Sequence, residues 1–274
     1  MPIVDLAIAA RERGFSSIFL NEHTHLPMSH PRSQWPGGPG PTPETYGRFW
    51  DPLVALSFVA AATDLTVGTA VCLVAQHDAI ALAKAVATLD VMSGGRVVFG
   101  VGWGWNREEF EDHGRGPANR RADVALEHVE AMTALWREES CGFDGAHVRF
   151  APSAAFPKPL QRPRPPVLLG APASERNLAR VVAHADGWIP MGPNVLFEDG
   201  LESALARLRA AWAEAGREPE GPRISVIQAA HGADRLAAAL DRADALGIER
   251  VIVYVGEMGQ EESIALLERL APAC

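Results

Sequence analysis

Residues 88–110 read TLDVMSGGRVVFGVGWGWNREEF, and this stretch decides the fold class of the chain. A helix is predicted to end at residues 93–95 (Ser-Gly-Gly), and an apolar strand follows at once over residues 96–101. The strand runs into a loop of alternating glycine and tryptophan and then into an acidic helix start at Glu108 and Glu109. This order of elements predicts an α/β fold, whose ligand site lies at the carboxyl ends of the strands.

The loop after this strand, Gly102-Trp103-Gly104-Trp105-Asn106, is a candidate binding loop. Small residues let a flat ligand approach the backbone, and the two indole rings can flank that ligand. The same residues also fit a glycine turn with two packing tryptophans, so both interpretations stay open. The loop is not a dinucleotide fingerprint, because that pattern needs glycine where Trp105 stands.

Composition narrows the function classes. The 274 residues are 47% hydrophobic, which is enough for one large α/β barrel or two ordinary domains. A net charge of −9 argues against nucleic-acid binding. The three cysteines, Cys72, Cys141 and Cys274, are widely spaced, which favours a reducing compartment. The N-terminal segment mixes charged and apolar residues, so we expect a cytoplasmic protein with neither signal peptide nor membrane span.

Helices and strands are predicted to alternate over the whole chain as one domain, residues 1–274. The predicted strands, which are apolar runs typical of strands covered on both faces, are 17–20, 65–72, 96–101, 166–170, 188–191, 223–229 and 250–255. The main predicted helices are 2–13, 51–62, 78–92, 118–138, 174–184, 198–215, 234–246 and 260–270. Repeated β-α units over this length predict a TIM (β/α)8-type barrel, with a doubly wound open sheet as the alternative.

The strand count falls one short of a barrel, which needs eight, and the chain begins on a helix where barrels begin on a strand. We therefore expect the first strand to be missing from this chain. On this expectation the natural reading frame begins about 10 to 15 residues upstream, a range set by usual strand and loop lengths.

Two segments interrupt the alternation. Residues 23–49 form a long loop rich in proline and glycine, and such loops are usually lids or binding loops. Residues 141–164 form an insertion, with a possible small hairpin at FDGAHVRF and a proline-rich crossing to the next strand.

Glu22, His23, Thr24 and His25 follow the first visible strand, where a barrel keeps its chemistry. A histidine there can act as a general acid or base near neutral pH. Two histidines at this spacing could instead bind a metal, but a metal site needs further ligands. Later strand ends offer only His231 and Glu257 nearby. The histidines could also only hydrogen-bond the loop.

Residues 170–174, Gly-Ala-Pro-Ala-Ser, join a strand to a helix start. Free N–H groups and the Ser174 hydroxyl at a helix N-terminus suit a phosphate, although ordinary helix capping explains the same residues. Cys72 ends an apolar strand, so a core position explains it as well as a reactive one.

These motifs together resemble the luciferase-like flavin and deazaflavin oxidoreductases, above all the branch that depends on coenzyme F-420. The matching segments, which run in family order from the first helix to about residue 192, are GFSSIFLNEHTHLP, WDPLVALSFVAAATDLTVGTAVCLV, LAKAVATLDVMSGGRVVFGVGWGWNREEF, FPKPLQRPRPPVLLGA and ADGWIPM. The last third matches only as generic barrel.

The resemblance implies roles for individual residues. It implies a TIM barrel with His23 beside the reactive ring carbon as catalytic acid or base, next to Glu22. It also implies a cis non-proline peptide behind the ring, at Cys72-Leu73. Gly102 and Asn106 match the loop at the ring and the ribityl chain, and Gly170, Ala171 and Ser174 match the phosphate loop. Pro172, which lacks an N–H, and Ala171, where a second glycine is common, depart from the family pattern.

The resulting hypothesis is an oxidoreductase that moves a hydride between coenzyme F-420 and a small organic substrate. His25, Trp35, Trp50 and Trp103 are expected to line the substrate pocket. The alternatives are an FMN-dependent monooxygenase served by a flavin reductase, a metal-dependent hydrolase, and a non-catalytic flavin carrier. We expect a homodimer and neither a bound metal nor a nucleic-acid or membrane partner.

Overall fold

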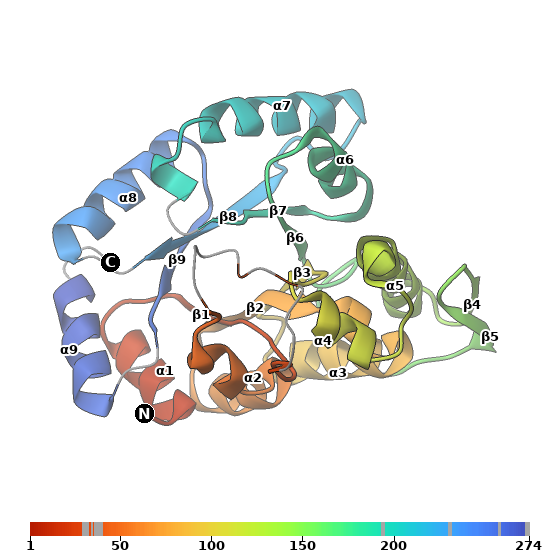
Figure 1. Cartoon of the computed structure of the whole chain (residues 1–274), viewed down its shortest axis with the longest axis horizontal. Helices are drawn as coiled ribbons and strands as arrows, with labels where there is room; N and C mark the ends of the chain where they lie inside the picture. Colours follow the sequence, from red (N-terminus) through yellow and green to blue (C-terminus); the bar gives the residue numbers. More distant parts are fainter. Residues whose placement is uncertain are drawn as a thin grey trace. The chain divides into compact units, whose positions relative to one another are not determined.

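Helices and strands alternate along the chain in the computed structural model (Figure 1). The structure describes residues 1–28, 33, 35, 41–192, 195–229, 232–256 and 259–271. The strands are β1 (Ser17–Leu20), β2 (Thr66–Leu73), β3 (Val97–Gly102), β4 (Cys141–Asp144), β5 (Arg149–Ser153), β6 (Val167–Ala171), β7 (Gly187–Pro190), β8 (Arg223–Ala229) and β9 (Arg250–Tyr254). The α-helices are α1 (Ile3–Glu12), α2 (Pro52–Ala62), α3 (Ala79–Met92), α4 (Arg107–Asp112), α5 (Arg121–Arg137), α6 (Glu175–His184), α7 (Leu201–Glu214), α8 (Ala233–Ala245) and α9 (Gln260–Leu270).

The predicted elements agree closely with these bounds. Outside the β4-β5 hairpin the described part of the chain has seven strands, as the apolar runs predicted. The main difference lies in the predicted helix 118–138, which begins as a 3-10 turn, η3 (Ala118–Arg120), and continues as α5. Glu108 and Glu109 belong to a separate short helix, α4, because the loop before it supplies its own cap at Asn106.

The chain divides into two compact units, each built from separate sequence segments. The first unit comprises residues 1–19, 58–67 and 166–274, and the second comprises residues 20–57 and 68–165. Strands β1 and β2 and helix α2 pass from one unit into the other. The prediction of a single domain stays a prediction.

In the first unit, strands β6, β7, β8 and β9 are neighbours in chain order, and each pair is parallel. Leu168 pairs with Gly187, for example, and Val226 pairs with Val251. Helix α9 packs against α1 through an apolar cluster of Ala9, Ala10 and Leu267. The two ends of the described chain therefore meet within this unit.

In the second unit, β2 and β3 are neighbouring strands, and every residue of β3 is buried. Helix α5 packs against α3, and the indole N–H of Trp136 donates to the carbonyl oxygen of Ala83 at 2.9 Å. The predicted hairpin is present as the antiparallel pair β4-β5. The carboxyl ends of β2 and β3 open into the loops that carry the predicted site.

Gly187 of β7 pairs with Arg223 of β8. A Cβ atom at this position would lie 2.0 Å from the carbonyl oxygen of Arg223, so one backbone would have to move. We expect Gly187→Ala to lower the free energy of unfolding by about 1–3 kcal/mol, the usual cost of overpacking. Gly256→Ala is the matched control, because its Cβ would meet no heavy atom within 4 Å. It should change stability by less than about 0.5 kcal/mol. Urea unfolding that gave both variants the same stability would contradict this account.

Candidate active site

Glu22 joins the carboxyl ends of two neighbouring strands. Glu22 is the second residue after β1, and it is 5% exposed. Its Oε2 accepts a hydrogen bond from the backbone N–H of Leu73, the last residue of β2, at 2.6 Å. Its Oε1 lies 2.8 Å from Nε2 of His77. A buried carboxylate needs such partners, so Glu22 fixes the position of the β2 terminus.

The Glu22–His77 contact is an ion pair. Burial acts to raise the pKa of Glu22, but the hydrogen bonds from His77, Leu73 and Cys72 outweigh it, so this pKa is lowered. Burial acts to lower the pKa of His77, but the hydrogen bond to Glu22 and the charge of that carboxylate outweigh it, so this pKa is raised. The two shifts favour an ionised carboxylate beside a protonated imidazole.

Cys72 lies beside the same carboxylate. Its thiol is fully buried, and burial, followed by the charge of Glu22, raises its pKa well above the usual value, so it is an unreactive thiol. One ligating atom each from Glu22, Cys72 and His77 lie within 4.8 Å of one another, a grouping that the sequence did not indicate. Hydrogen bonds within the protein already occupy both carboxylate oxygens of this group.

His23 is held by a second buried carboxylate. Its Nδ1 lies 2.6 Å from Oε2 of Glu109, and the two side chains are 6% and 0% exposed. The indole N–H of Trp105 donates to His23 Nε2 at 3.2 Å. An indole N–H can only donate, so Nε2 is the acceptor and the ring hydrogen of His23 is on Nδ1. The histidine is therefore fixed in one tautomer, with Nε2 free of hydrogen.

The loop after β3 brings Glu109 to this position. Asn106 is the N-cap of α4, and its side chain accepts from the backbone N–H of Glu109 at 3.0 Å. Gly104 has a φ of +72°, and a Cβ there would meet the Leu73 side chain at 3.5 Å. The Arg121 guanidinium donates to the Gly104 carbonyl at 3.0 Å. A left-handed residue in close contact with its neighbour favours glycine.

Aromatic rings surround His23. The ring centroids of Tyr46, Trp105 and Phe49 lie 5.3, 5.6 and 6.0 Å from the imidazole centroid. Trp35 packs edge-on against Tyr46 at 6.1 Å. Tyr46 comes from the 3-10 turn η1 (Glu44–Arg48), so the described part of the loop 23–49 supplies walls of the site. Residues 29–32, 34 and 36–40 of that predicted lid lie outside the described part of the chain.

Two buried N–H donors beside these residues have no hydrogen-bond partner in the described part of the chain. One is Nε2 of Gln76, which lies close to Gly104, and the other is Nε1 of Trp35. A buried donor without a partner costs about 1–3 kcal/mol, so such groups are typical of ligand sites. A flavin or deazaflavin ring system carries oxygen and nitrogen acceptors on an aromatic plane. The orphaned donors and the aromatic walls fit such a group.

The predicted phosphate loop belongs to the first unit, so its residues, Gly170, Ala171 and Ser174, are described within that unit. Gly170 and Ala171 are buried at the end of β6, where the Ala171 carbonyl accepts from the indole N–H of Trp188 at 2.9 Å. Ser174 is exposed and caps α6 by accepting from the backbone N–H of Asn177. Ordinary capping thus explains Ser174, and the phosphate-loop role of these residues stays a prediction.

One prediction from the resemblance is wrong in position. The cis non-proline peptide lies at Ala70-Val71, two residues before the predicted Cys72-Leu73 bond. A shift of two residues along a strand keeps every side chain on the same face, so the sequence pattern could not separate the two positions.

The predicted pocket residues do not all gather around His23. Glu22, Cys72 and Leu73 lie together, and Asn106 acts through Glu109. His25 instead contacts Asp112 and the Thr24 hydroxyl, while Trp50 is 51% exposed. Gly102 is the buried last residue of β3, and Trp103 follows it in the loop and is partly buried. The alternative metal candidates His231 and Glu257 lie outside the described residues.

Sequence reasoning missed the role of Glu109. Its position three residues after Asn106 matches a capping box, which explained the acid as a helix start. Full burial beside His23 is a tertiary feature that this local pattern does not reveal. Gln76 and His77 likewise receive no role from the sequence, because each is unremarkable until β2 and β3 are placed side by side. Trp105 is expected there only as a side chain flanking the ligand, and its hydrogen bond to His23 is not foreseen.

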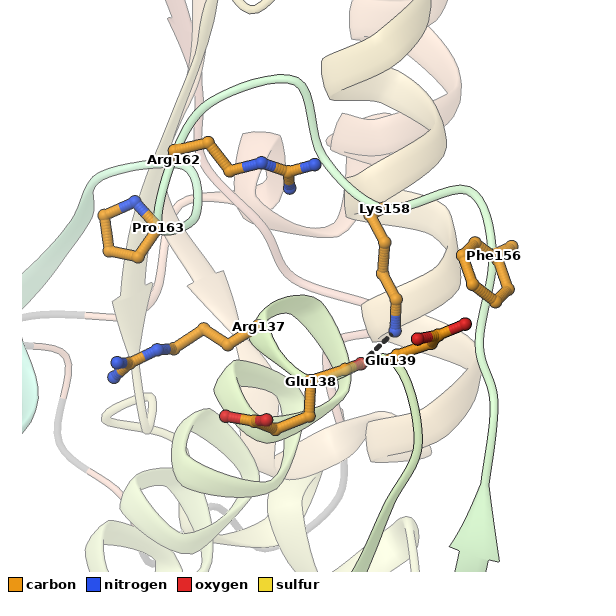
Figure 2. Close-up of a pocket in the computed structure, with 7 residues that line it drawn as sticks. All are labelled: Arg137, Glu138, Glu139, Phe156, Lys158, Arg162 and Pro163. Atoms are coloured by element: carbon orange, nitrogen blue, oxygen red, sulfur yellow. Dashed lines mark hydrogen bonds between the residues drawn. The ribbon is translucent and has the colours of Figure 1, made fainter.

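A hollow of about 770 Å³ lies elsewhere in the second unit (Figure 2). It is lined by Arg137, Glu138, Glu139, Phe156, Lys158, Arg162 and Pro163. The Lys158 ammonium donates to the Leu135 carbonyl at 2.8 Å and to that of Glu138, so it caps the end of α5. None of the predicted site residues lines this hollow, which forms where the crossing segment packs on the helix.

No helix in the described part of the chain is long and apolar enough to cross a lipid bilayer. The predicted cytoplasmic location and homodimer stay predictions.

Comparison with protein families and curated sequences gives consistent results. Residues 2–267 match the model of a family described as luciferase-like monooxygenase. Uncharacterized protein Rv0953c of Mycobacterium tuberculosis is 39% identical over 264 residues, which cover 96% of this chain and 90% of that protein. The F420-dependent glucose-6-phosphate dehydrogenase of Nakamurella multipartita is 31% identical over 223 residues, which cover 78% of this chain and 59% of that protein.

Solved structures confirm the predicted fold. Monooxygenase RslO1 from Streptomyces bottropensis has a TM-score of 0.77 at 22% identity, covering 99% of this chain and 91% of that one. An F420-dependent secondary alcohol dehydrogenase has a TM-score of 0.76 at 17% identity, covering 98% of this chain and 93% of that one. The fold is an α/β barrel of the luciferase-like TIM type.

The Glu22–His77 ion pair predicts how stability depends on pH. Because the pKa of His77 is raised, its ionisation contributes to the free energy of unfolding. This contribution is complete below the ordinary pKa of 6.5 and is lost as the pH rises through the pKa of the folded protein. The lowered pKa of Glu22 gives a stabilising contribution that is complete above the ordinary pKa of 4.5 and is lost as the pH falls through the pKa of the folded protein. Between about pH 6 and pH 9, the wild type should therefore lose its stability advantage over His77→Gln. Thermal melts across this range test the effect, with the exposed His147→Gln as control. A constant difference between wild type and His77→Gln would contradict the ion pair.

Proposed function

The chain belongs to the luciferase-like monooxygenase family, and from this premise we propose that it transfers a hydride between coenzyme F-420 and a small organic substrate. Family membership makes it an oxidoreductase with a flavin or deazaflavin cofactor. The choice of F-420 is supported by the sequence motifs and by the similarity to an F420-dependent dehydrogenase at 31% identity.

The observation that carries the proposal is the fixed tautomer of His23. Glu109 holds the Nδ1–H, so Nε2 presents a lone pair. A neutral imidazole in this orientation is a general base, because it can take a proton at Nε2 while the carboxylate stabilises the imidazolium that results. Oxidation of an alcohol requires such a base at the hydroxyl group. The reverse reaction uses the same atom as the acid.

The residues that would hold the cofactor lie along the ends of β2 and β3. Gly104 has no side chain beside Leu73 and Gln76, so a flat ring could approach its backbone there, and Gln76 has a buried amide N–H without a partner in the described part of the chain that could bind a ring carbonyl or nitrogen. The helix start at Gly170–Ser174 is proposed to take a phosphate of the cofactor. When bound, F-420 supplies or takes the hydride at one ring carbon. The protein orients the rings and holds the proton.

The aromatic side chains have a separate task. Tyr46, Phe49 and Trp105 surround His23, so a substrate that reaches Nε2 would pass between aromatic rings. Trp105 must give up its hydrogen bond to Nε2 when the substrate arrives. This arrangement suits a small, partly apolar alcohol or carbonyl compound.

An FMN-dependent monooxygenase is the second candidate, because the family description and the structure of RslO1 both name monooxygenases. That activity needs a reduced flavin, which a partner flavin reductase would supply. Cofactor preference separates the two candidates.

We expect the protein to bind F-420 with a micromolar or lower Kd and to bind FMN more weakly. The two cofactors have similar tricyclic ring systems. We therefore expect the site to discriminate between them through the side chains and phosphate contacts around the rings. Side-by-side fluorescence titrations measure both constants. Tighter binding of FMN, together with oxygen consumption when a flavin reductase is added, would reassign the protein as a monooxygenase.

We expect His23→Ala to lower turnover by roughly 10² or more, the usual loss when a general acid or base is removed. Cofactor affinity should change little, because the ring donates to Glu109 and accepts only from Trp105. His147→Ala is the control, since that histidine is exposed and donates to Glu127 through its backbone N–H. Undiminished turnover in His23→Ala would remove His23 from the mechanism and make His25 or His231 the next candidate.

A further inference from the structure

Among the described residues, the Glu109 carboxylate of the buried His23–Glu109 pair is hydrogen-bonded on its other side to Thr24. Glu109 is 0% exposed, so water does not reach its carboxylate directly. Oε2 of Glu109 faces His23, while Oε1 accepts from the backbone N–H of Thr24 at 2.8 Å and lies 3.3 Å from its hydroxyl. On this side the Thr24 hydroxyl is the side-chain group within hydrogen-bond distance of the carboxylate that can both accept and donate a proton.

Four side-chain atoms converge on that hydroxyl. Its Oγ1 lies 2.8 Å from His113 Nε2 and 3.0 Å from His25 Nδ1. It lies 3.3 Å from Glu109 Oε1 and 3.4 Å from Gln76 Oε1. A hydroxyl has one hydrogen to donate, so it can serve only one of these acceptors at a time. Which contact receives the hydrogen therefore depends on the protonation of the two imidazoles.

We propose that the Thr24 hydroxyl is a proton relay, which carries protons between the buried His23–Glu109 pair and solvent by way of the imidazoles of His113 and His25. The proposal rests on the proposed role of His23 as the proton acceptor. Thr24 acts through Glu109 and touches no substrate, so it is a positioning residue.

The outer members of the relay reach solvent. His25 Nε2 lies 3.0 Å from Oδ2 of Asp112, and these two side chains are 41% and 59% exposed. His113 lies beside His25, with 5.7 Å between ring centroids. Burial, and then the neighbouring His25, lowers the pKa of His113, so its ring is neutral near neutral pH and can accept a hydrogen.

The proton moves in single, balanced transfers. His23 takes a proton from the substrate at Nε2 and becomes an imidazolium, which the Glu109 carboxylate stabilises. In the next transfer its Nδ1–H bond breaks as an O–H bond forms on Glu109. The carboxyl group turns and releases that proton to Thr24 Oγ1, whose own hydrogen passes to Nε2 of His113. His113 then loses its Nδ1 hydrogen to water. No electrons are transferred. The forward sequence leaves the hydrogen of His23 on Nε2, and the reverse sequence delivers that proton to the substrate and restores the Nδ1–H tautomer.

The exchange of the His23 Nδ1 hydrogen with solvent tests the relay without any turnover. The rate can be measured by NMR on protein whose histidines are labelled with ¹⁵N. The Nδ1–H of His23 has a distinct signal, because its nitrogen lies 2.6 Å from Oε2 of Glu109 in a short hydrogen bond. We expect Thr24→Val to slow the exchange roughly tenfold or more, since it removes the transferring hydroxyl. The backbone N–H that binds Glu109 remains in this variant.

Thr24→Ser is the matched control, because it restores the hydroxyl, and its exchange rate should match the wild type. An unchanged or faster rate in Thr24→Val, with the His23 signal still shifted by Glu109, would overturn the relay. So would a rate in Thr24→Ser as slow as in Thr24→Val.

Turnover separates the relay from the proposed function. In the F-420-loaded enzyme, Thr24→Val should lower kcat and raise its solvent deuterium isotope effect, while KM changes little and Thr24→Ser recovers both. If exchange slows but neither cofactor supports turnover, the relay stands and the proposed function fails. If turnover is present but the exchange rate is the same in wild type and Thr24→Val, the function stands and the relay fails.

Discussion

A carboxylate that has no contact with water must fill its lone pairs from the protein, and Glu109 meets this requirement by binding His23 and Thr24. His23 and Thr24 come from the loop after β1 and Glu109 from helix α4, more than 80 positions later in the sequence. Removal of either partner would leave a buried charge poorly satisfied. The same contact that stabilises this end of the fold therefore orients the imidazole that we assign to the chemistry.

Glu22, the residue before His23, imposes a similar constraint. Its carboxylate binds the terminus of β2 and the His77 imidazole, so adjacent residues anchor to two different neighbouring strand loops. The pair Glu22-His23 thus places the loop after β1 against the loops after β2 and β3 at once. Gly104 permits the close approach, and the aromatic rings of Tyr46, Phe49 and Trp105 close the space around the imidazole.

Local pattern was sufficient for most of the secondary structure. The apolar runs gave the strands, and Asp78, Asn106 and Ser174 each cap a helix by the hydrogen bond expected of their residue types. His23 could be selected because a histidine directly after a strand stands at the chemical edge of an α/β fold. The cis peptide was misplaced by two residues, since a strand repeats every two residues and offers no signal at that spacing.

The sequence by itself determined the α/β barrel, the order of its elements and the strand ends at which the candidate site lies, because these follow from short-range periodicity and capping. Only the tertiary structure decided that Glu109 turns inward to His23, that Gln76 keeps a buried amide without a partner, and that Thr24 joins two imidazoles to the buried pair. Each of these depends on the distance between side chains far apart in the sequence. Such distances are fixed when the strands pair and the loops pack, and no local pattern in the chain encodes them.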